Sequence, residues 1–337
     1  MASLKAYIIT RILLTIPMIL ILLTIVFFIM RIMPGDPVLA IVGAKAPPEQ
    51  IMKLREQLGL NKPLYVQYFD YLVCLLHGDF GRSLIWGKRP VLAEIFDHFP
   101  ATLELTISAF IVSVIIGLLT GIYSAYKLNK PTGYAIRLYG IVAYALFIPW
   151  FGMILQLIFG VQLKLFPIYG RIDPGIAPKT ITGLYLIDSL LTGDMTLFIS
   201  TIKHLFLPSI TLGIVLSGVY TRLTRSNMIE VLRQDFITAA RARGVRERVI
   251  LFKHALKNAF IPILTMMGLQ FALLLAGAVL TETTFSWPGM GTFLMDRIEY
   301  RDFPTVQGTI VFFALLVALV SLIVDVFYAY LDPRIRY

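Results

Sequence analysis

Cysteine, histidine and charged residues are scarce in this chain. Among 337 residues there are one cysteine and four histidines, and only 15% of the residues are charged. A single cysteine excludes an intramolecular disulfide, and because Cys74 lies in an apolar run we expect it to be buried. The histidines lack metal-ligand spacing, so we expect no metal site and place them in solvated or interfacial positions. They are His77, His98, His204 and His254.

Motifs of enzyme chemistry are missing as well. No glycine-rich loop of the form G-x-x-x-x-G-K-[ST] is present, because Gly87-Lys88 lacks both the preceding glycine and the following hydroxyl. No serine lies in a G-x-S-x-G elbow. We therefore expect a protein that is not an enzyme, holds no cofactor and cannot hydrolyse ATP by that device.

Apolar residues dominate the composition. They make up 58% of the chain, with a mean hydropathy of +0.79, which is too much apolar surface for a water-soluble globule. Six segments approach the ~20 apolar residues that a membrane span needs. The first is too long for a signal peptide and lacks a cleavage site, so we expect it to be retained. The segments are 12–30, 103–126, 138–163, 205–221, 261–280 and 309–330.

Basic residues lie mainly on one side of these spans. One set of alternate segments holds 16 basic and 4 acidic residues, whereas the opposite set holds 14 of each. The positive-inside rule assigns the basic side, with both termini, to the cytoplasm. The net charge of +10 thus reflects topology and predicts no nucleic-acid partner. The basic segments are 1–11, 127–137, 222–257 and 332–337.

The predicted fold is an all-α membrane protein with six transmembrane helices. Residues 1–33 form an N-terminal segment and the first span. Residues 34–100 form an external region with two helices, one from Pro48 to Gly59 and an aromatic-rich one over 64–76, which could shield the bundle or dock a soluble partner. Residues 101–337 form a five-helix core with an external loop at 164–204 and a cytoplasmic region at 222–258.

A capped helix is predicted within the cytoplasmic region. Asp235 suits an N-cap, Arg241 and Arg243 occupy the last turn, where the helix dipole favours cations, and Gly244 suits a left-handed stop. A second helix should run from 246 to 258, with Pro262 in the first turn of the fifth span. A role in setting the membrane topology would explain the basic residues of this region, but it would not explain the capping residues at both ends of the predicted helix. The pattern therefore favours docking of a partner protein.

Polar groups within the spans are candidates for function. We interpret Glu104 as a first-turn carboxylate and expect Asp325 to pair with a basic residue of the cytoplasmic region. The polar and small residues of the fourth span favour helix packing, with the wall of a substrate passage as the alternative. For that passage we name Thr211, Ser217 and Gln270.

Six motifs occur in order along the whole chain: Arg31–Pro37, His77–Leu84, Pro100–Leu105, Glu282–Gly291, Arg301–Gly308 and Leu331–Arg336. Together they resemble the motifs of a permease subunit of an ABC importer, in the dipeptide, oligopeptide and nickel branch of binding-protein-dependent transport systems. The region around Thr238-Ala239-Ala240 and Gly244 is similar to the family's EAA loop, with Thr in place of the acidic residue and a long spacing to Pro262.

The resemblance implies a type I ABC importer permease fold in the cytoplasmic membrane of a prokaryote. It implies that 235–244 is a coupling helix for one of two cytosolic ATPase subunits, which would carry ATP and Mg²⁺. A second homologous permease and an extracytoplasmic binding protein would complete the assembly, and substrate would cross by alternating access. We expect a short peptide as substrate, with oligosaccharide or nickel as alternatives. A channel or secondary transporter working alone is the competing class.

Overall fold

The computed structural model describes residues 4–32, 47–57, 59–85 and 87–331. Parts of the predicted first external region and the C-terminal segment 332–337 lie outside these residues. The described residues form helices, with one isolated bridge between Arg82 and Pro90. Five helices among them are long and apolar enough to cross a membrane. These are α1 (Leu4–Ile32), α5 (Val91–Tyr126), α9 (Met195–Leu232), the helix that contains α12 (Leu256–Gly277), and α15 (Phe303–Leu331).

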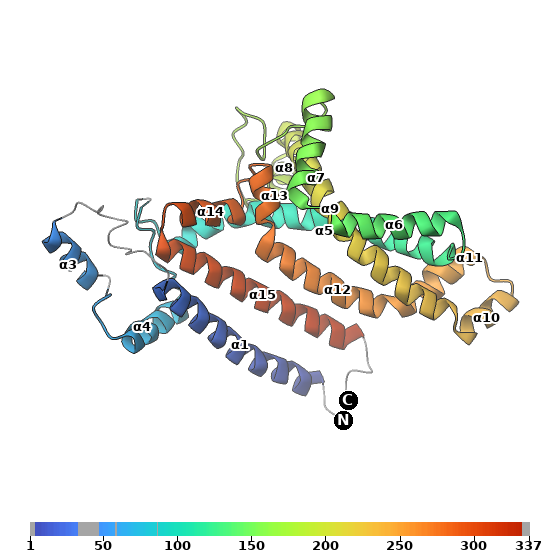
Figure 1. The fold of residues 1–337 in the computed structure, drawn as a ribbon, viewed down its shortest axis with the longest axis horizontal. Coiled ribbons are helices and arrows are strands. Elements are labelled where there is room, and N and C mark those ends of the chain that lie inside the picture. The colour runs from blue at the N-terminus through green and yellow to red at the C-terminus, as the bar shows by residue number, and fades with distance from the viewer. Residues whose placement is uncertain (1–3, 33–46, 58, 86, 332–337) are drawn as a thin grey trace.

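The predicted third span is broken rather than continuous. It consists of α6 (Pro131–Ala145) and α7 (Ile148–Leu155) followed by a π-helical turn, η1 (Gln156–Gln162), and the two halves meet at an angle of 105°. Pro149 lies in the first turn of α7. In a continuous helix it would have no N–H to donate to the carbonyl of Ala145, and its ring would clash with that carbonyl. Figure 1 shows α7 projecting away from α6. The described residues therefore contain six membrane spans only if this bent pair is counted as one span.

Two spans are longer than predicted because their external ends are polar but still helical. Helix α5 begins at Val91, twelve residues before the predicted start, and contains Pro100. Helix α9 begins at Met195 inside the predicted external loop, where the Asp194 carboxylate accepts hydrogen bonds from two backbone N–H groups of its first turn. Hydropathy alone does not detect such extensions, since they are stabilised by tertiary contacts and caps.

Close backbone contacts hold α9 at the centre of the bundle. A Cβ added at Gly117 of α5 would lie 2.3 Å from the Cβ of Tyr220, and one at Gly213 of α9 would lie 2.5 Å from Val112. On another face, a Cβ at Gly218 would lie 2.7 Å from the carbonyl oxygen of Gly140 in α6. Small residues allow helices to approach this closely, so these contacts confirm the packing interpretation of the fourth span.

Helices α1, α12 and α15 lie beside this central group (Figure 1). Helix α1 packs on α15 through Leu23, Val26 and Met30. At the other end of this pair, the Arg11 guanidinium lies 3.5 Å from the Asp325 carboxylate. The predicted pairing of Asp325 with the cytoplasmic region is therefore wrong, because α1 supplies a nearer cation.

Shorter helices complete the chain. The two predicted for the first external region are present, and Gly59 and Gly78 adopt the left-handed backbone that ends them. Cys74 is exposed on the second of these, contrary to prediction, because α4 has one face turned away from α1. His204 is buried in α9 and His98 stacks on Phe293. The short helices are α3 (Pro48–Gln57), α4 (Leu64–Leu76), α8 (Tyr185–Thr192), α10 (Asp235–Ala242), α11 (Glu247–Val249), α13 (Val279–Thr284) and α14 (Met290–Glu299).

Candidate functional site

Helix α10 lies at one end of the molecule, between α9 and the helix that leads into α12 (Figure 1). Ile237 and Ala240 point inward and are 0% and 3% exposed. They join a cluster with residues of α9, the end of α5 and the π-helical turn η2 (Ile250–Ala255). The short helix is thus held on three neighbouring segments, which positions its opposite face for contact with another molecule.

The end of α10 is defined by a left-handed glycine. Gly244 has φ +76°, its N–H donates to the carbonyl of Arg241 at 2.9 Å, and the N–H of Val245 donates to the carbonyl of Ala240 at 3.2 Å. This pair of bonds is a Schellman motif. Val245 also packs against the cluster that contains Ala240, so the predicted stop at Gly244 is confirmed.

The beginning of α10 differs by one residue from the prediction. Gln234 is the N-cap, with extended backbone, and Asp235 is the first helical residue; no side chain caps this end. Asp235 still places its carboxylate in the first turn, where the dipole favours a negative charge. Its N-cap role is incorrect because Gln234 has the extended N-cap backbone, and the Gln234 carbonyl already accepts the N–H groups of Ile237 and Thr238.

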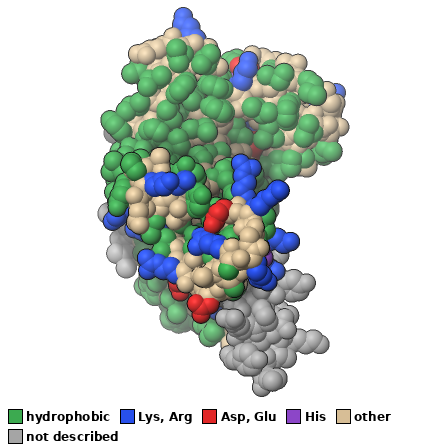
Figure 2. Space-filling view, turned by 90° about the vertical axis from the view of Figure 1, so that its right-hand side faces the viewer, with side chains coloured by type: hydrophobic (Ala, Val, Ile, Leu, Met, Phe, Trp, Pro, Cys, Tyr) green, Lys and Arg blue, Asp and Glu red, His purple; other side chains and the backbone are tan. Residues whose placement is uncertain are grey.

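Basic side chains gather around this end of the molecule (Figure 2). Arg241 pairs with Glu247 across the turn, with 2.9 Å between Nε and Oε1, and both side chains are more than two-fifths exposed. The backbone carbonyl of Ala239 accepts a hydrogen bond from Arg243. Of the predicted coupling residues, Ala240 alone is buried. The exposed ones are Asp235, Thr238, Ala239, Arg241, Arg243 and Gly244.

The second predicted cytoplasmic helix has no end before the fifth span. Helices α11, η2 and α12 form one continuous helix from Glu247. Ile250 and Ala255 are fully buried in the cluster beneath α10, which keeps this segment helical. Pro262 therefore lies inside the helix and not in its first turn. Movement of α10 would be carried directly into the fifth span.

The residues named for a substrate passage are placed on two helices. Thr211 and Ser217 are buried on α9, and Gln270 is half-buried on α12. The hydroxyl of Thr211 donates to the carbonyl of Leu207, and that of Ser217 donates to the carbonyl of Ile214 and contacts the Tyr139 hydroxyl. These bonds satisfy both hydroxyls within the chain. Their role in translocation stays a prediction.

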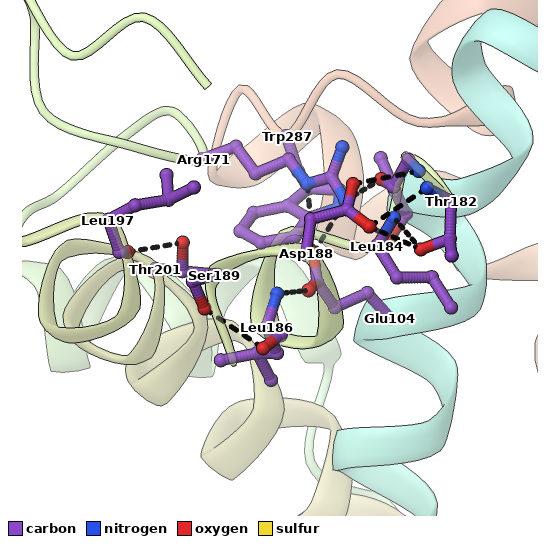
Figure 3. Close-up of polar contacts among 12 residues, drawn as sticks. Glu104, Arg171, Thr182, Leu184, Leu186, Asp188, Ser189, Leu197, Thr201 and Trp287 are labelled. Carbon is purple, nitrogen blue, oxygen red and sulfur yellow. Dashed lines mark hydrogen bonds and ion pairs between the residues drawn. The ribbon is translucent and has the colours of Figure 1, made fainter. Parts of the chain in front are cut away.

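A buried ion pair holds the second external loop against α5 (Figure 3). The Glu104 and Arg171 side chains are 3% and 7% exposed, and Nη2 of Arg171 lies 2.6 Å from Oε2 of Glu104. The other carboxylate oxygen accepts the backbone N–H of Leu186 at 2.8 Å. The guanidinium also lies over the Tyr185 ring, 3.7 Å from its centroid. Glu104 is thus a mid-helix partner for this loop and not a first-turn carboxylate.

Asp188 organises the same loop from within α8. Its two carboxylate oxygens accept the backbone N–H groups of residues 181, 182 and 183 and the hydroxyl of Thr182. Burial raises the pKa of the Asp188 carboxyl, but these hydrogen bonds outweigh burial and the net pKa lies below its ordinary value. The anionic form therefore stabilises the loop.

A third buried carboxylate joins two sequence motifs. Glu282 in α13 accepts hydrogen bonds from the Thr102 hydroxyl at 2.7 Å and from the Gly291 N–H at 2.7 Å. Nearby, the Trp287 indole N–H donates to the carbonyl of Ala101 at 2.8 Å. Burial raises the pKa of the Glu282 carboxyl, and its hydrogen bonds oppose this rise. The segment 282–291 is thereby fixed to the external half of α5.

Two more buried acids lie in the same part of the molecule. Together with Glu104, Asp188 and Glu282 they form a layer of buried acidic side chains, called the external layer below. Asp302 accepts hydrogen bonds from the hydroxyls of Ser83 and Thr305, and Glu94 pairs with Arg297 at 2.9 Å. Sequence reasoning missed pairs such as Glu104 with Arg171 and Glu94 with Arg297 because the partners are 67 and 203 residues apart in the chain. An acid within an apolar stretch was the available signal, at Glu104. Among the described residues, no group of three or more His, Cys, Asp or Glu side chains could hold a metal ion.

The structure has long apolar helices, a short exposed helix between two of them, and the hydrogen-bonded external layer at the opposite end. These features define a multi-pass membrane protein of the transport class. Two family profiles match the chain: binding-protein-dependent transport system inner membrane component over residues 117–337, and its N-terminal counterpart over residues 4–106. The chain belongs to this family, the inner-membrane permease components of ABC importers, and has the type I permease fold.

Relatives match along nearly the whole chain. A dipeptide transport system permease protein of Alkalihalophilus pseudofirmus is 43% identical over 332 residues, covering 98% of this chain and 99% of the relative. A di/tripeptide transport system permease protein of Pseudomonas aeruginosa is 44% identical over 314 residues, covering 92% and 93%. A glutathione transport system permease protein of Salmonella typhi is 39% identical over 336 residues, covering 98% and 99%.

Proposed function

We propose that this chain is a permease subunit of an ATP-driven importer for dipeptides or other short peptides. The names of the relatives support a peptide in preference to an oligosaccharide or nickel, since they are dipeptide, di/tripeptide and glutathione permeases. Two cytosolic ATPase subunits, a second homologous permease and an extracytoplasmic binding protein would complete the transporter. The permease pair would move substrate by alternating access.

The observation that carries this proposal is the geometry of α10. The helix is anchored through Ile237 and Ala240. Its exposed face is mixed, with Asp235, Thr238 and Phe236, and lies beside a basic surface. It connects α9 to the continuous helix that leads into α12. A partner that pushes on this face would shift two long helices together, which is what coupling of ATP hydrolysis to transport requires.

The same helix fixes the proposed orientation. With α10 and the basic segments on the cytoplasmic side, both termini are cytoplasmic, in agreement with the positive-inside rule. The layer held by Glu104, Asp188 and Glu282 then faces the outside, where a binding protein would deliver substrate. This layer is pinned by buried hydrogen bonds, so it would present a preformed surface to that partner.

Co-purification tests the assembly. After mild detergent extraction, the tagged chain should recover two ATPase polypeptides and a second permease. Replacing Thr238 with tryptophan should reduce ATPase recovery, because Thr238 is exposed and the added bulk would meet only a docked partner. Lys130→Trp, on another exposed segment, should leave recovery unchanged. Normal ATPase recovery and activity with Thr238→Trp would refute docking at α10.

Uptake assays test the substrate. Vesicles with the full complex would receive labelled dipeptides, pentapeptides, cellobiose-type sugars and nickel in parallel. We expect ATP-dependent uptake of the dipeptides. Uptake of nickel or sugar alone would contradict the proposed substrate, and transport by this chain alone without ATP would support the competing class of stand-alone transporter.

A further inference from the structure

Helix α4 contacts the side of the membrane-spanning helix α1 near its C-terminal end. The Tyr68 hydroxyl lies 2.6 Å from the Thr24 hydroxyl, and the rings of Tyr68 and Tyr71 contact the Phe27 ring, with centroids 5.3 and 5.6 Å apart. Leu72 and Leu75 join the cluster between α1 and α15. One face of α4 is therefore fully used in contacts with two spans.

The position of Thr24 gives the depth of α4. The apolar stretch of α1 extends from Ile9 to Arg31, and Thr24 lies seven residues before its end. At 1.5 Å per residue this is roughly 10 Å inside the stretch. A helix whose side chains reach Thr24 and Phe27 lies beside the hydrophobic part of α1, and Figure 1 shows α4 next to the end of α1 that is far from the N-terminus. The distance from the end of the apolar stretch corresponds to the depth of a lipid leaflet.

The outward face of α4 is apolar and is left exposed by the residues that the structure describes. Tyr65, Phe69, Val73 and Leu76 are 68%, 63%, 52% and 86% exposed. At about 100° per residue these four side chains fall within an arc of about 80°. Large exposed apolar patches mark contact with a membrane or a protein. The patch continues the exposed apolar surface of α1, which includes Ile25, Phe28 and Ile29.

Apart from the tyrosine hydroxyls, the polar side chains of α4 lie on a third face. Gln67, Asp70 and Cys74 line a cavity of about 590 Å³ that also contains Arg31 and Gln307. Asp70 is further paired with Lys62 at 2.6 Å. Because the polar groups are segregated into this cavity, they do not require the apolar face to meet water.

We propose that α4 is inserted in the membrane leaflet at the C-terminal end of α1, with the face formed by Tyr65, Phe69, Val73 and Leu76 against lipid acyl chains. The region between the first two spans then does not lie entirely in water. Its second helix is a non-spanning element of the bilayer, as expected for a helix whose polar and apolar faces are separated. The inference is independent of the substrate and of the ATPase partners.

Spin labels on α4 test this insertion. Phe69→Cys and Val73→Cys would be made in a Cys74→Ala background of the full chain, reconstituted in phospholipid vesicles. Collision rates of the label with oxygen, which concentrates in lipid, and with a water-soluble nickel chelate would be compared. Ile16→Cys on exposed α1 is the lipid reference, and Glu56→Cys on exposed α3 is the water reference.

We expect labels at positions 69 and 73 to favour oxygen, as at position 16. A nickel preference like that at position 56 would overturn the proposal and restore a soluble cap, and protection from both probes would overturn it in favour of a protein partner. In the otherwise unchanged chain, native Cys74 should react with a membrane-impermeant thiol reagent at least about tenfold faster than Val73→Cys, because thiolates form in water and not in lipid. Equal rates would contradict the assignment of the two faces.

Discussion

Replacing Gly244 with alanine separates the geometry of the coupling turn from its packing. The residue has φ +76°, and a Cβ added there meets no atom within 4 Å. The substitution therefore introduces no clash. Its cost is that of left-handed backbone for an L-residue, roughly 1–2 kcal/mol, which lowers the population of the native turn roughly 5- to 30-fold relative to its alternatives.

The consequence should appear in coupling and not in membrane insertion. The bonds from Gly244 and Val245 to the end of α10 orient the helix that leads into the fifth span, whereas no span residue is changed. We expect substrate-stimulated ATP hydrolysis and uptake by the reconstituted complex to fall severalfold with normal amounts of chain in the membrane. Gly244→Val should be more severe, because a β-branched side chain restricts the turn further.

Gly78 provides a matched control. It has φ +75°, open space around an added Cβ, and the same pair of turn hydrogen bonds at the end of α4. Gly78→Ala should cost the same backbone energy but leave ATP hydrolysis coupled to substrate. Equal activity of the Gly244→Ala and Gly78→Ala complexes, both near wild type, would refute the role of the α10 turn in coupling.

The external layer yields three further predictions. Arg171→Met should lower the free energy of unfolding in detergent by about 3–5 kcal/mol, because it leaves the buried Glu104 carboxylate unpaired. The control Arg89→Ala, which breaks an exposed pair with Asp97, should lower it by at most about 1 kcal/mol. Equal losses for the two variants would contradict the argument. Asp188→Asn should speed amide hydrogen exchange at residues 181–183 near neutral pH. In the unmodified chain the anionic carboxylate protects these amides above its ordinary pKa, and this protection is lost as the pH falls through the lowered pKa. Unchanged exchange in the variant would rule out Asp188 as the anchor of this loop. Gly117→Val should destabilise the bundle by about 1–3 kcal/mol or more, because its Cβ would lie 2.3 Å from that of Tyr220. The control Ile111→Val, on an exposed site of the same helix, should leave the thermal transition unchanged. A similar thermal transition for both variants would show that α5 and α9 can separate freely.

Local signals in the sequence predicted most of the helices and their ends. Apolar runs located the spans because the membrane interior selects for them along a contiguous stretch. Glycines at 59, 78 and 244 marked helix ends, since left-handed backbone is readily available only to glycine. The small residues of the fourth span indicated close packing. The short helix before Gly244 was also predictable, because its charges and its glycine stop lie within ten residues, although its N-cap is Gln234 and not Asp235.

Contacts between distant residues were decided only by the tertiary structure. Glu104 read alone suits a first helical turn, but its partner Arg171 lies 67 residues away. The pairing of Asp325 with Arg11 and of Glu282 with Thr102 has the same origin. The bend at 146–147 and the lateral position of α4 against α1 also depend on neighbours that hydropathy does not register. Periodicity and composition report what a segment prefers, whereas the burial of a charge depends on which other segment brings its counter-charge.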